Sequence, residues 1–206
     1  MLPLHLAKMT TFMLNSGVRD DVACNLRWEW EVRVTLGELE VLVFRIPNDR
    51  SKVHKKSKRT FDYVVCNSAA QEVVDSMRGR HAEFVFVWRR ERTSNHNLKR
   101  HRVELPMSWR QIQTMNNTAW QRARTAAGLE GLHVHDLRHT VGTRLRAAAV
   151  PEETRALILW HGAESMTTHY SAPMVREVHN ALELIKQPSG LENQTLESLG
   201  KSSGRA

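Results

Sequence analysis

The sequence predicts an α+β fold, mainly α-helical with a small three-stranded antiparallel sheet. Over most of the chain, apolar residues recur at spacings of three and four, which is the period of an amphipathic helix. Between Val32 and Val65 the pattern changes to alternating and continuous runs of β-branched and aromatic residues, as strands require. With 41% hydrophobic residues among 206, the chain is long enough for one domain with a substantial core.

Two helices are expected at the beginning of the chain. Gly17, after Asn15-Ser16, is suited to the left-handed conformation that closes many helices, so the first helix should end there. A short second helix is expected over 20–27. The apolar positions of the first helix follow spacings of four, three and four: Leu2, Leu6, Met9 and Met13.

The three strands of the sheet are expected next. The alternating segment 32–35 and the dense apolar run 41–46 flank a Gly-Glu turn and should form a hairpin. A polar, lysine-rich loop over 49–59 leads to the segment 61–65, which supplies the third strand.

The rest of the chain should be mainly helical. The segment 84–88 is the exception, since its apolar run is expected to be extended and buried, and the polar, basic loop 89–102 follows it. Helices are expected over 68–77, with Ser68 as the cap, over 108–127 up to Gly128, from near His135, from Pro151 to Gly162, and from around Ser165.

Composition limits the partner and the compartment. A formal net charge of +8 and a pI near 10.0 favour a polyanionic partner, of which nucleic acid is the commonest. Cys24 and Cys66 form no CxxC pair, which favours a reducing compartment. No apolar run is long enough to cross a bilayer, and residues 1–17 lack a cleavage-site pattern. A cytoplasmic protein is expected, with no membrane partner.

The densest group of chemically active residues is the run HDLRH at positions 135–139. On a helix that begins here, His135, Arg138 and His139 are neighbours, because residues three and four apart share a face. Three interpretations compete: a metal site built on the two histidines, a structural pairing of Arg138 with a carboxylate, and a phosphate site. Arg138 would place a fixed cation beside a metal ion, and no nearby Cys or Glu completes a ligand set, so no metal is expected.

Residues further along the chain favour the phosphate site. The run LWHG at 159–162 ends a helix, and Tyr170 follows nine residues after His161. HDLRH, then a helix, then HG and then a tyrosine at that distance resembles the C-terminal signature of the tyrosine recombinases of the phage-integrase type.

The resemblance extends upstream of this signature. The runs SGVR at 16–19 and LRW at 26–28 look like that family's first-arginine box, in which a helix ends at a glycine turn just before the catalytic arginine. The end of the hairpin at Lys52 matches the place of the family's catalytic lysine. The similarity covers nearly the whole chain, from about Leu4 to about Leu184.

The resemblance implies site-specific DNA recombination or integration, with Tyr170 forming a 3′-phosphotyrosine intermediate during strand cleavage and rejoining. Arg19 and Arg138 would bind the non-bridging phosphate oxygens and offset the charge of the transition state. Neither a metal ion nor another cofactor is implied. The remaining roles are protonation of the leaving 5′ oxygen by Lys52, acid–base catalysis by His135 and hydrogen bonding to the phosphate by His161.

One position departs from the family pattern, and the identity of the catalytic lysine stays open. Three residues after the first arginine the family has a Glu, whereas Val22 stands here, with Asp20 and Asp21 just before it as candidate substitutes. The lysine-rich loop is longer than the family's usual hairpin, so three further lysines compete with Lys52 for the catalytic role: Lys55, Lys56 and Lys58.

The expected domain organisation is a tyrosine recombinase catalytic domain over 1–186 and a disordered tail over 187–206, without the N-terminal core-binding domain of full-length relatives. The expected partners are double-stranded DNA, further copies of the chain in a tetramer on DNA, and a protein that supplies the missing domain. The stripe Val175, Val178, Leu182 and Ile185 either serves that assembly or packs on its own domain.

Two alternative functions remain open on sequence grounds. The first is a truncated, catalytically impaired integrase remnant that acts only as a DNA-binding protein. The second is a type IB topoisomerase, which uses the same Arg, Lys, His and Tyr chemistry, although the HDLRH and HG runs favour the integrase branch.

Overall fold

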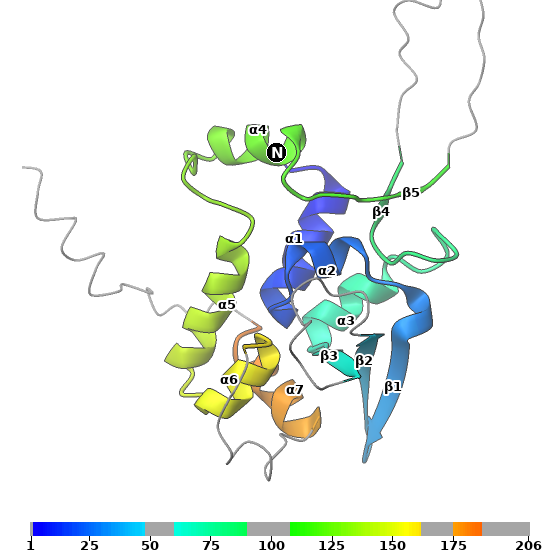
Figure 1. The fold of residues 1–206 in the computed structure, drawn as a ribbon, viewed down its shortest axis with the longest axis vertical. Helices are drawn as coiled ribbons and strands as arrows, with labels where there is room; N and C mark the ends of the chain where they lie inside the picture. Colours follow the sequence, from blue (N-terminus) through cyan, green and yellow to red (C-terminus); the bar gives the residue numbers. More distant parts are fainter. Residues whose placement is uncertain (1, 48–59, 90–107, 162–174, 187–206) are drawn as a thin grey trace, which may run out of the picture.

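The computed structural model describes residues 2–47, 60–89, 108–161 and 175–186 (Figure 1). Within these ranges the fold is mainly helical and includes an antiparallel sheet of order β1-β2-β3, so the predicted fold class is confirmed. The helices are α1 Leu4–Ser16, α2 Asp20–Cys24, the 3₁₀ turn η1 Trp28–Trp30, α3 Ser68–Asp75, α4 Thr118–Ala126, α5 Asp136–Ala147, α6 Glu152–Ile158 and α7 Val175–Leu184. The strands are β1 Glu31–Leu36, β2 Leu39–Pro47, β3 Phe61–Val65, β4 Val87–Trp88 and β5 Arg110–Gln111.

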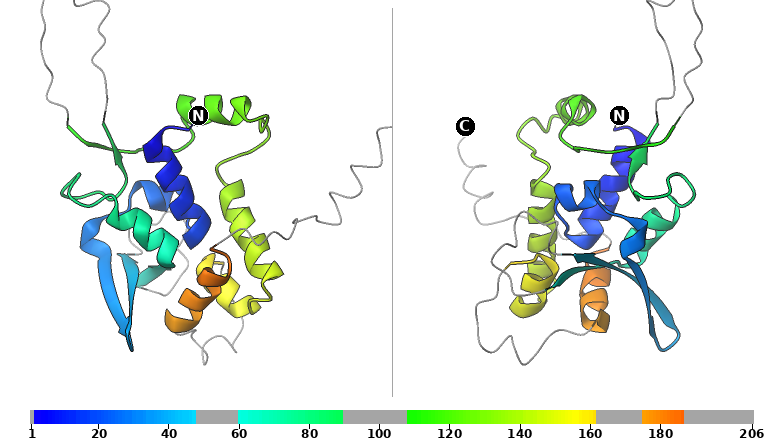
Figure 2. Two further views of the ribbon diagram at one scale, coloured as in Figure 1. Left: turned by 180° about the vertical axis from the view of Figure 1, so that it is seen from behind. Right: turned by 45° about the vertical axis from the view of Figure 1, so that its right-hand side comes forward.

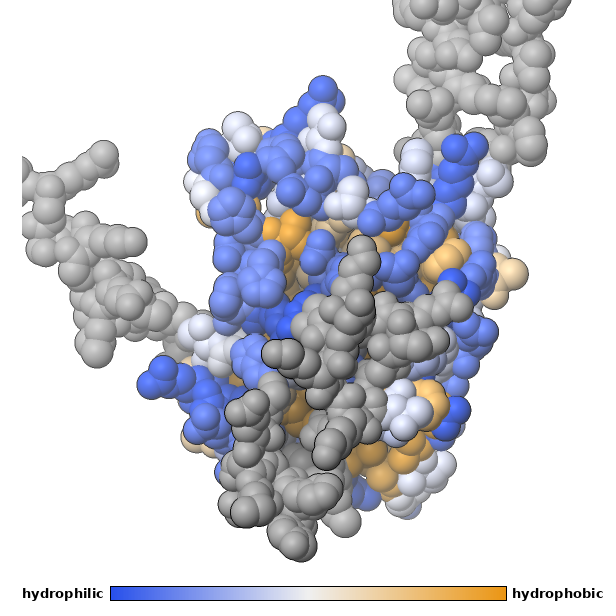
Figure 3. All heavy atoms as spheres, viewed as in Figure 1, coloured by the Kyte–Doolittle hydropathy of each residue, from blue (hydrophilic) through white to orange (hydrophobic). Residues whose placement is uncertain are grey.

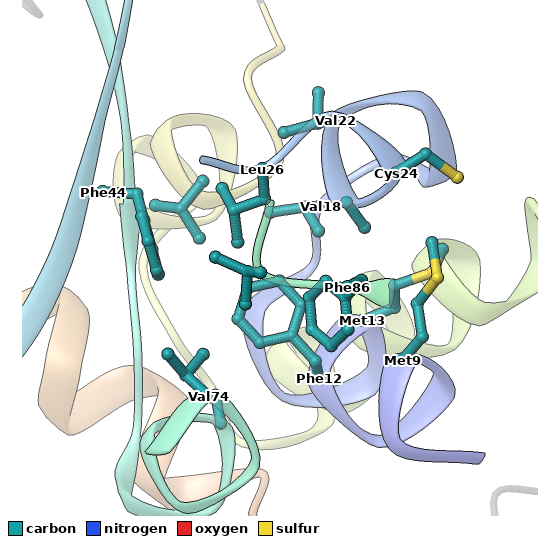
Figure 4. Packing of buried hydrophobic residues seen from close by; sticks show 14 of the residues in the cluster. Met9, Phe12, Met13, Val18, Val22, Cys24, Leu26, Phe44, Val74 and Phe86 are labelled. Atoms are coloured by element: carbon teal, nitrogen blue, oxygen red, sulfur yellow. The ribbon is translucent and has the colours of Figure 1, made fainter. Parts of the chain in front are cut away.

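Helix α1 is the centre of the larger hydrophobic core. It packs against α3 on one side and α5 on the other, with the three-stranded sheet beyond α3 (Figures 1 and 2). Phe12 of α1 and Phe86, just before β4, lie with their ring centroids 5.0 Å apart in this core (Figure 4). Both phenylalanines are fully buried, as are Met9 and Met13 on the same face of α1. The predicted apolar face of the first helix is thus the face that organises the domain.

The sheet separates this core from a second one. Along β2, Leu42, Phe44 and Ile46 face the core around α1, whereas Val41 and Val43 face a second core against α5, α6 and α7. Successive side chains of a strand point to opposite faces, so a strand covered on both sides must be apolar at nearly every position. This explains the continuous apolar run that the sequence has here.

The third strand has the bounds expected of it, whereas the two hairpin strands extend one or two residues beyond the expected segments 32–35 and 41–46. Strands β1 and β2 are joined by a two-residue turn in which Gly37 has φ +68°, so the first turn position requires left-handed backbone. Strand β3 pairs with β2 in antiparallel register, with Val64 opposite Phe44.

The expected helix over 108–127 is wrong in its first half. Arg110 and Gln111 form β5, which pairs with Trp88 and Val87 of β4 in a second small sheet. Helix α4 begins only at Thr118, because the Asn117 side chain caps it by accepting hydrogen bonds from the N–H groups of Ala119 and Trp120.

Two other helices also begin or end away from their expected positions. Helix α3 is capped by the side chain of Asn67 rather than Ser68. Helix α2 ends at Cys24, since Arg27 is extended and forms an isolated β-bridge with Phe84.

Helix α7 is held on the domain by polar as well as apolar contacts. The buried Asn67 side chain donates hydrogen bonds to Asn15 Oδ1 at 3.0 Å and to the Leu182 carbonyl at 2.8 Å. The Glu183 carboxylate accepts from the N–H of Ser68 at 2.6 Å. Leu182 itself is buried in the second core, together with the other inward residues of the α7 stripe. The stripe therefore packs on its own domain.

Three helices end in the same hydrogen-bond motif with different residues at the left-handed position. After α4 that residue is Gly128, after α5 it is Ala149 with φ 55°, and after α6 it is Trp160 with φ 48°. In each case the next residue donates its N–H to the carbonyl five positions back, as in a Schellman motif. The expected end of α6 at Gly162 is therefore corrected, since the chain turns before that residue, at Trp160.

No helix among the described segments is long and apolar enough to span a membrane.

The end of α5 provides a test of backbone strain. A left-handed conformation costs a residue with a Cβ about 1–2 kcal/mol, whereas glycine gains flexibility in the unfolded chain that offsets about 0.4–1 kcal/mol. Ala149→Gly is therefore expected to raise the free energy of unfolding by about 0.5–1 kcal/mol. Urea denaturation measures this change. The control is Ala147→Gly at the last helical residue of α5, where the same substitution should lower stability.

Candidate active site

The turn at Gly17 joins the first helix to α5 and α6. Gly17 has φ +71°, and a Cβ there would lie 3.2 Å from Val141 Cγ1 and 3.3 Å from Ile158 Cγ2. The α5 residue Arg138 donates a hydrogen bond from Nη1 to the Gly17 carbonyl at 2.7 Å. Glycine is needed for both the backbone conformation and the close approach. The predicted left-handed cap is confirmed, and it also brings the start of α2 next to α5.

Two guanidinium groups meet at this turn. Arg19 lies two residues after Gly17, at the N-cap of α2, and Arg138 is only 4% exposed. Burial and the neighbouring charge of Arg19 lower the pKa of Arg138 to about 10. Two like charges held together in a partly buried site favour the binding of an anion between them.

Each of the two arginines has a buried donor available for a ligand. Arg19 Nη1 and Arg138 Nη2 have no hydrogen-bond partner among the residues that the structure describes. A buried N–H without a partner costs about 1–3 kcal/mol, and such groups in native proteins call for an explanation. A phosphate or sulfate ion placed between the two arginines could accept a hydrogen bond from each of these donors, and such charge-assisted hydrogen bonds are strong.

The acidic residues nearby only partly offset this charge. Within the described part of the chain neither arginine forms an ion pair, and the structural interpretation of Arg138 as a carboxylate partner finds no support there. Asp21 lies close enough to favour the charged form of Arg138. Val22, at the position of the family's glutamate, is 9% exposed and belongs to the core around α1. The carboxylate that favours the charged form of Arg138 is therefore that of Asp21, one residue before Val22.

The histidines surround the arginine pair. His135 stands at the N-cap of α5, and its ring lies edge-on to that of His139 with centroids 4.7 Å apart. Both are exposed, whereas Arg138 lies on the inner side of the same helix with Val141. Burial, then Arg138, Arg19, His139 and His135, lower the pKa of His161 below its usual value. The site thus combines two permanent cations with three histidines close to one another.

His161 is placed by the unusual end of α6. Trp160 adopts the left-handed conformation and its indole Nε1 donates to the Tyr63 carbonyl of β3 at 3.1 Å. The N–H of His161 then donates to the Ala156 carbonyl at 2.8 Å. The contribution of Trp160 is not visible in the sequence, because a glycine would ordinarily occupy its position and Gly162 is nearby.

Asp136 of the HDLRH run has a structural role in the described fold. Its carboxylate accepts a hydrogen bond from the His133 N–H at 2.7 Å, and it lies in the first turn of α5, where a negative charge complements the helix dipole. It thereby fixes the turn from which His135 and Arg138 project.

Several predicted site residues lie outside the described part of the chain. These are Tyr170 and Lys52, together with the three competing lysines, Lys55, Lys56 and Lys58. Of the residues predicted for the site, the structure brings four together: Arg19, Arg138, His135 and His161. Within the described ranges no three His, Cys, Asp or Glu side chains are grouped as metal ligands would be.

Comparison with known proteins gives two matches and one negative result. Residues 1–176 match the phage integrase family. The chain is also 30% identical over 146 residues to the integrase of Salmonella phage P22, a match that covers 71% of this chain and 33% of the phage protein. The chain thus spans about a third of the length of this curated relative. No solved structure matches the chain.

The Gly17 turn yields a stability prediction with an internal control. Gly17→Ala introduces both a strained φ and a Cβ at 3.2–3.3 Å from neighbouring side chains, and should cost about 2–4 kcal/mol of folding free energy. Gly79→Ala has φ +75° but no atom within 4 Å of the new Cβ, and should cost only about 1 kcal/mol. Equal losses in urea denaturation would contradict the proposed tight approach of α1 to α5 and α6.

The environment of His161 yields a prediction for pH dependence. Since its pKa is lowered in the folded state, the unfolded chain binds more protons between the two pKa values. The associated stability is present above the unfolded pKa of about 6.5 and is lost as the pH falls through the folded pKa. NMR titration of the His161 ring should give a value below 6.5 that rises when inorganic phosphate is added. His161→Asn identifies the signal, and a free-protein pKa at or above the usual value would contradict the prediction.

Proposed function

Because the chain belongs to the phage integrase family, we propose that it cleaves and rejoins double-stranded DNA at specific sites, with Tyr170 as the nucleophile. Family membership itself implies site-specific recombination and DNA binding. We propose in addition that this chain is active and that its own residues carry out the chemistry.

The observation that carries the proposal is the pair of buried guanidinium groups. Arg19 and Arg138 come from distant parts of the sequence, lie close enough to repel each other, and each keeps one buried N–H without a partner among the described residues. A scissile phosphate placed between them would satisfy both donors. As a fifth oxygen approaches phosphorus, negative charge grows on the non-bridging oxygens, and preorganised cations stabilise that state more than the ground state.

The proposed cleavage step balances without a cofactor. The phenolic oxygen of Tyr170 forms a bond to phosphorus while the bond from phosphorus to the 5′ oxygen breaks. The product is a 3′-phosphotyrosine and a free 5′-hydroxyl, which receives a proton from Lys52. Rejoining is the reverse attack by a 5′-hydroxyl, so the phosphodiester bond energy is kept in the covalent intermediate.

The histidines are proposed to handle the tyrosine proton and the phosphate. A phenol has a pKa of about 10, so at neutral pH attack is slow without a base. His135 is exposed beside the arginine pair and is proposed as that base. His161, whose pKa is lowered by burial and then by its cationic neighbours, is proposed to hydrogen-bond to the phosphate.

The assembly on DNA is also part of the proposal. We infer a tetramer on DNA for recombination, together with a protein or domain that supplies the DNA contacts of the family's N-terminal module. The chain covers about a third of the P22 integrase. In the isolated chain the α7 stripe is already covered by its own domain.

The decisive experiment traps the covalent intermediate. Wild-type protein is incubated with a nicked duplex library randomised around the nick, so that cleavage releases a short 5′-hydroxyl fragment and leaves the protein attached to DNA. A denaturing gel should detect the adduct, and Tyr170→Phe should abolish it, because phenylalanine lacks the attacking oxygen. DNA binding by the wild type without any adduct would favour the DNA-binding remnant, and relaxation of supercoiled plasmid without site preference would favour a topoisomerase.

The arginine pair has its own kinetic prediction. Arg138→Lys keeps one positive charge but loses both the bidentate fork and the hydrogen bond to Gly17. The rate of adduct formation should fall by about 10²–10³. Arg146→Lys, on the exposed last turn of the same helix, is the control and should retain the wild-type rate. A wild-type rate for Arg138→Lys would exclude the proposed phosphate clamp.

A further inference from the structure

A second group of cations lies around Trp109, away from the arginine pair. The guanidinium groups of Arg80 and Arg89 each lie 5.0 Å from the centroid of the Trp109 ring. Arg80 follows α3, Arg89 follows β4 and Trp109 precedes β5, so three separate segments meet here. Stacking on an indole orders a guanidinium group while its N–H groups remain available at the edge of the plane.

The two arginines of this group differ from three other arginines of the described segments in their ion pairs. Arg27 pairs with Glu83, Arg33 with Glu31, Glu40 and Asp75, and Arg78 with Glu31 and Asp75. Arg78 also stacks on a tryptophan, Trp28, at 5.0 Å. By contrast, Arg80 and Arg89 have no hydrogen bond or ion pair with any residue in the described segments. Arginines with and without carboxylate partners thus both stack on tryptophan, but the charges of Arg80 and Arg89 are not neutralised by a carboxylate in the described segments.

Lys8 extends this cationic group onto α1. Its ammonium group donates to Ser76 Oγ at 2.9 Å, and the nearby charge of Arg80, after burial, lowers its pKa. Three cations therefore lie close together without a carboxylate partner in the described part of the chain. Such a group is electrostatically unfavourable alone and attracts a polyanion.

The position of this group relates it to the active site. Lys8 lies on α1 and Gly17 caps its C-terminal end nine residues later, a separation of about 14 Å along the helix axis. In a DNA duplex that length corresponds to about four base pairs. Figure 3 shows mainly hydrophilic residues over α4, at one end of the molecule. A duplex that extends beyond the active site along α1 would reach the three cations.

We propose that Arg80, Arg89 and Lys8, ordered around Trp109, form a second contact with the backbone phosphates of duplex DNA, separate from the active site. The choice of DNA as the polyanion rests on the proposed function, but the contact does not require cleavage. Phosphates are favoured over bases because the indole ring already carries two guanidinium groups, and arginine matches phosphate geometry through its fork.

The test measures how duplex affinity depends on salt. Wild-type protein, Arg80→Gln, Arg89→Gln and the double variant are titrated with a 30-base-pair duplex of arbitrary sequence at several salt concentrations. Each lost phosphate contact should reduce the slope of log K against log salt by about 0.9, so the double variant should lose nearly 2 and bind about tenfold or more weakly. Arg146→Gln removes one exposed charge from the end of α5 and controls for net charge.

The outcomes separate this proposal from the proposed function. A double variant with wild-type affinity and slope overturns the second contact, whether or not the wild type forms a covalent adduct. A reduced slope supports it, even for a wild type that forms no adduct. Arg80→Lys with Arg89→Lys keeps the charges and should retain most of the slope. If the glutamine variants instead lose binding to poly-L-glutamate while duplex affinity is unchanged, the surface binds an acidic protein and the DNA contact is excluded.

Discussion

The hydrogen bond from Arg138 to the Gly17 carbonyl, together with the close contact around Gly17, is the constraint on which the rest of the site depends. It joins the end of α1 to the start of α5 across more than half of the chain. Because Arg19 is only two residues from Gly17, the same contact sets the separation of the two guanidinium groups. Because Gly17 lacks a Cβ, Val141 and Ile158 can pack closely against the turn whose carbonyl the buried arginine contacts. The geometry of the proposed phosphate clamp is therefore a consequence of how two helices pack.

This arrangement places unfavourable electrostatics at the centre of the molecule. One N–H of Arg138 is satisfied by the protein, and another stays without a partner in the described structure, beside a second arginine. Folding must offset this repulsion with the apolar contacts of α1, α5 and α6 around it. Such a site gains stability when an anion enters, which is the property required of a catalyst that binds a phosphate more tightly as its charge increases.

The parts of the fold that the sequence predicts well are those specified by local signals. The Gly17 cap, the hairpin with Gly37 in its turn, and strand β3 over 61–65 all follow from patterns within a few residues. The β4–β5 pair was not predictable, because two-residue strands gain their stability from a partner more than twenty positions away. At the candidate site, sequence reasoning named both arginines as well as His135 and His161, which the structure brings together. It missed the role of Trp160, because a left-handed tryptophan contradicts its own backbone preference and is held there by the contact with β3.

The attachment of α7 has a consequence for how this helix can move. The Asn67 amide has used its donors on Asn15 and on a carbonyl of α7, and its oxygen caps α3. If α7 departed, the Asn67 amide would lose its hydrogen bond to the Leu182 carbonyl, and the leucine and valine surface that α7 covers would be exposed to water. Detachment of α7 therefore loses both polar and apolar contacts. An incoming segment would have to present a peptide carbonyl at the same depth, which an apolar surface alone cannot do.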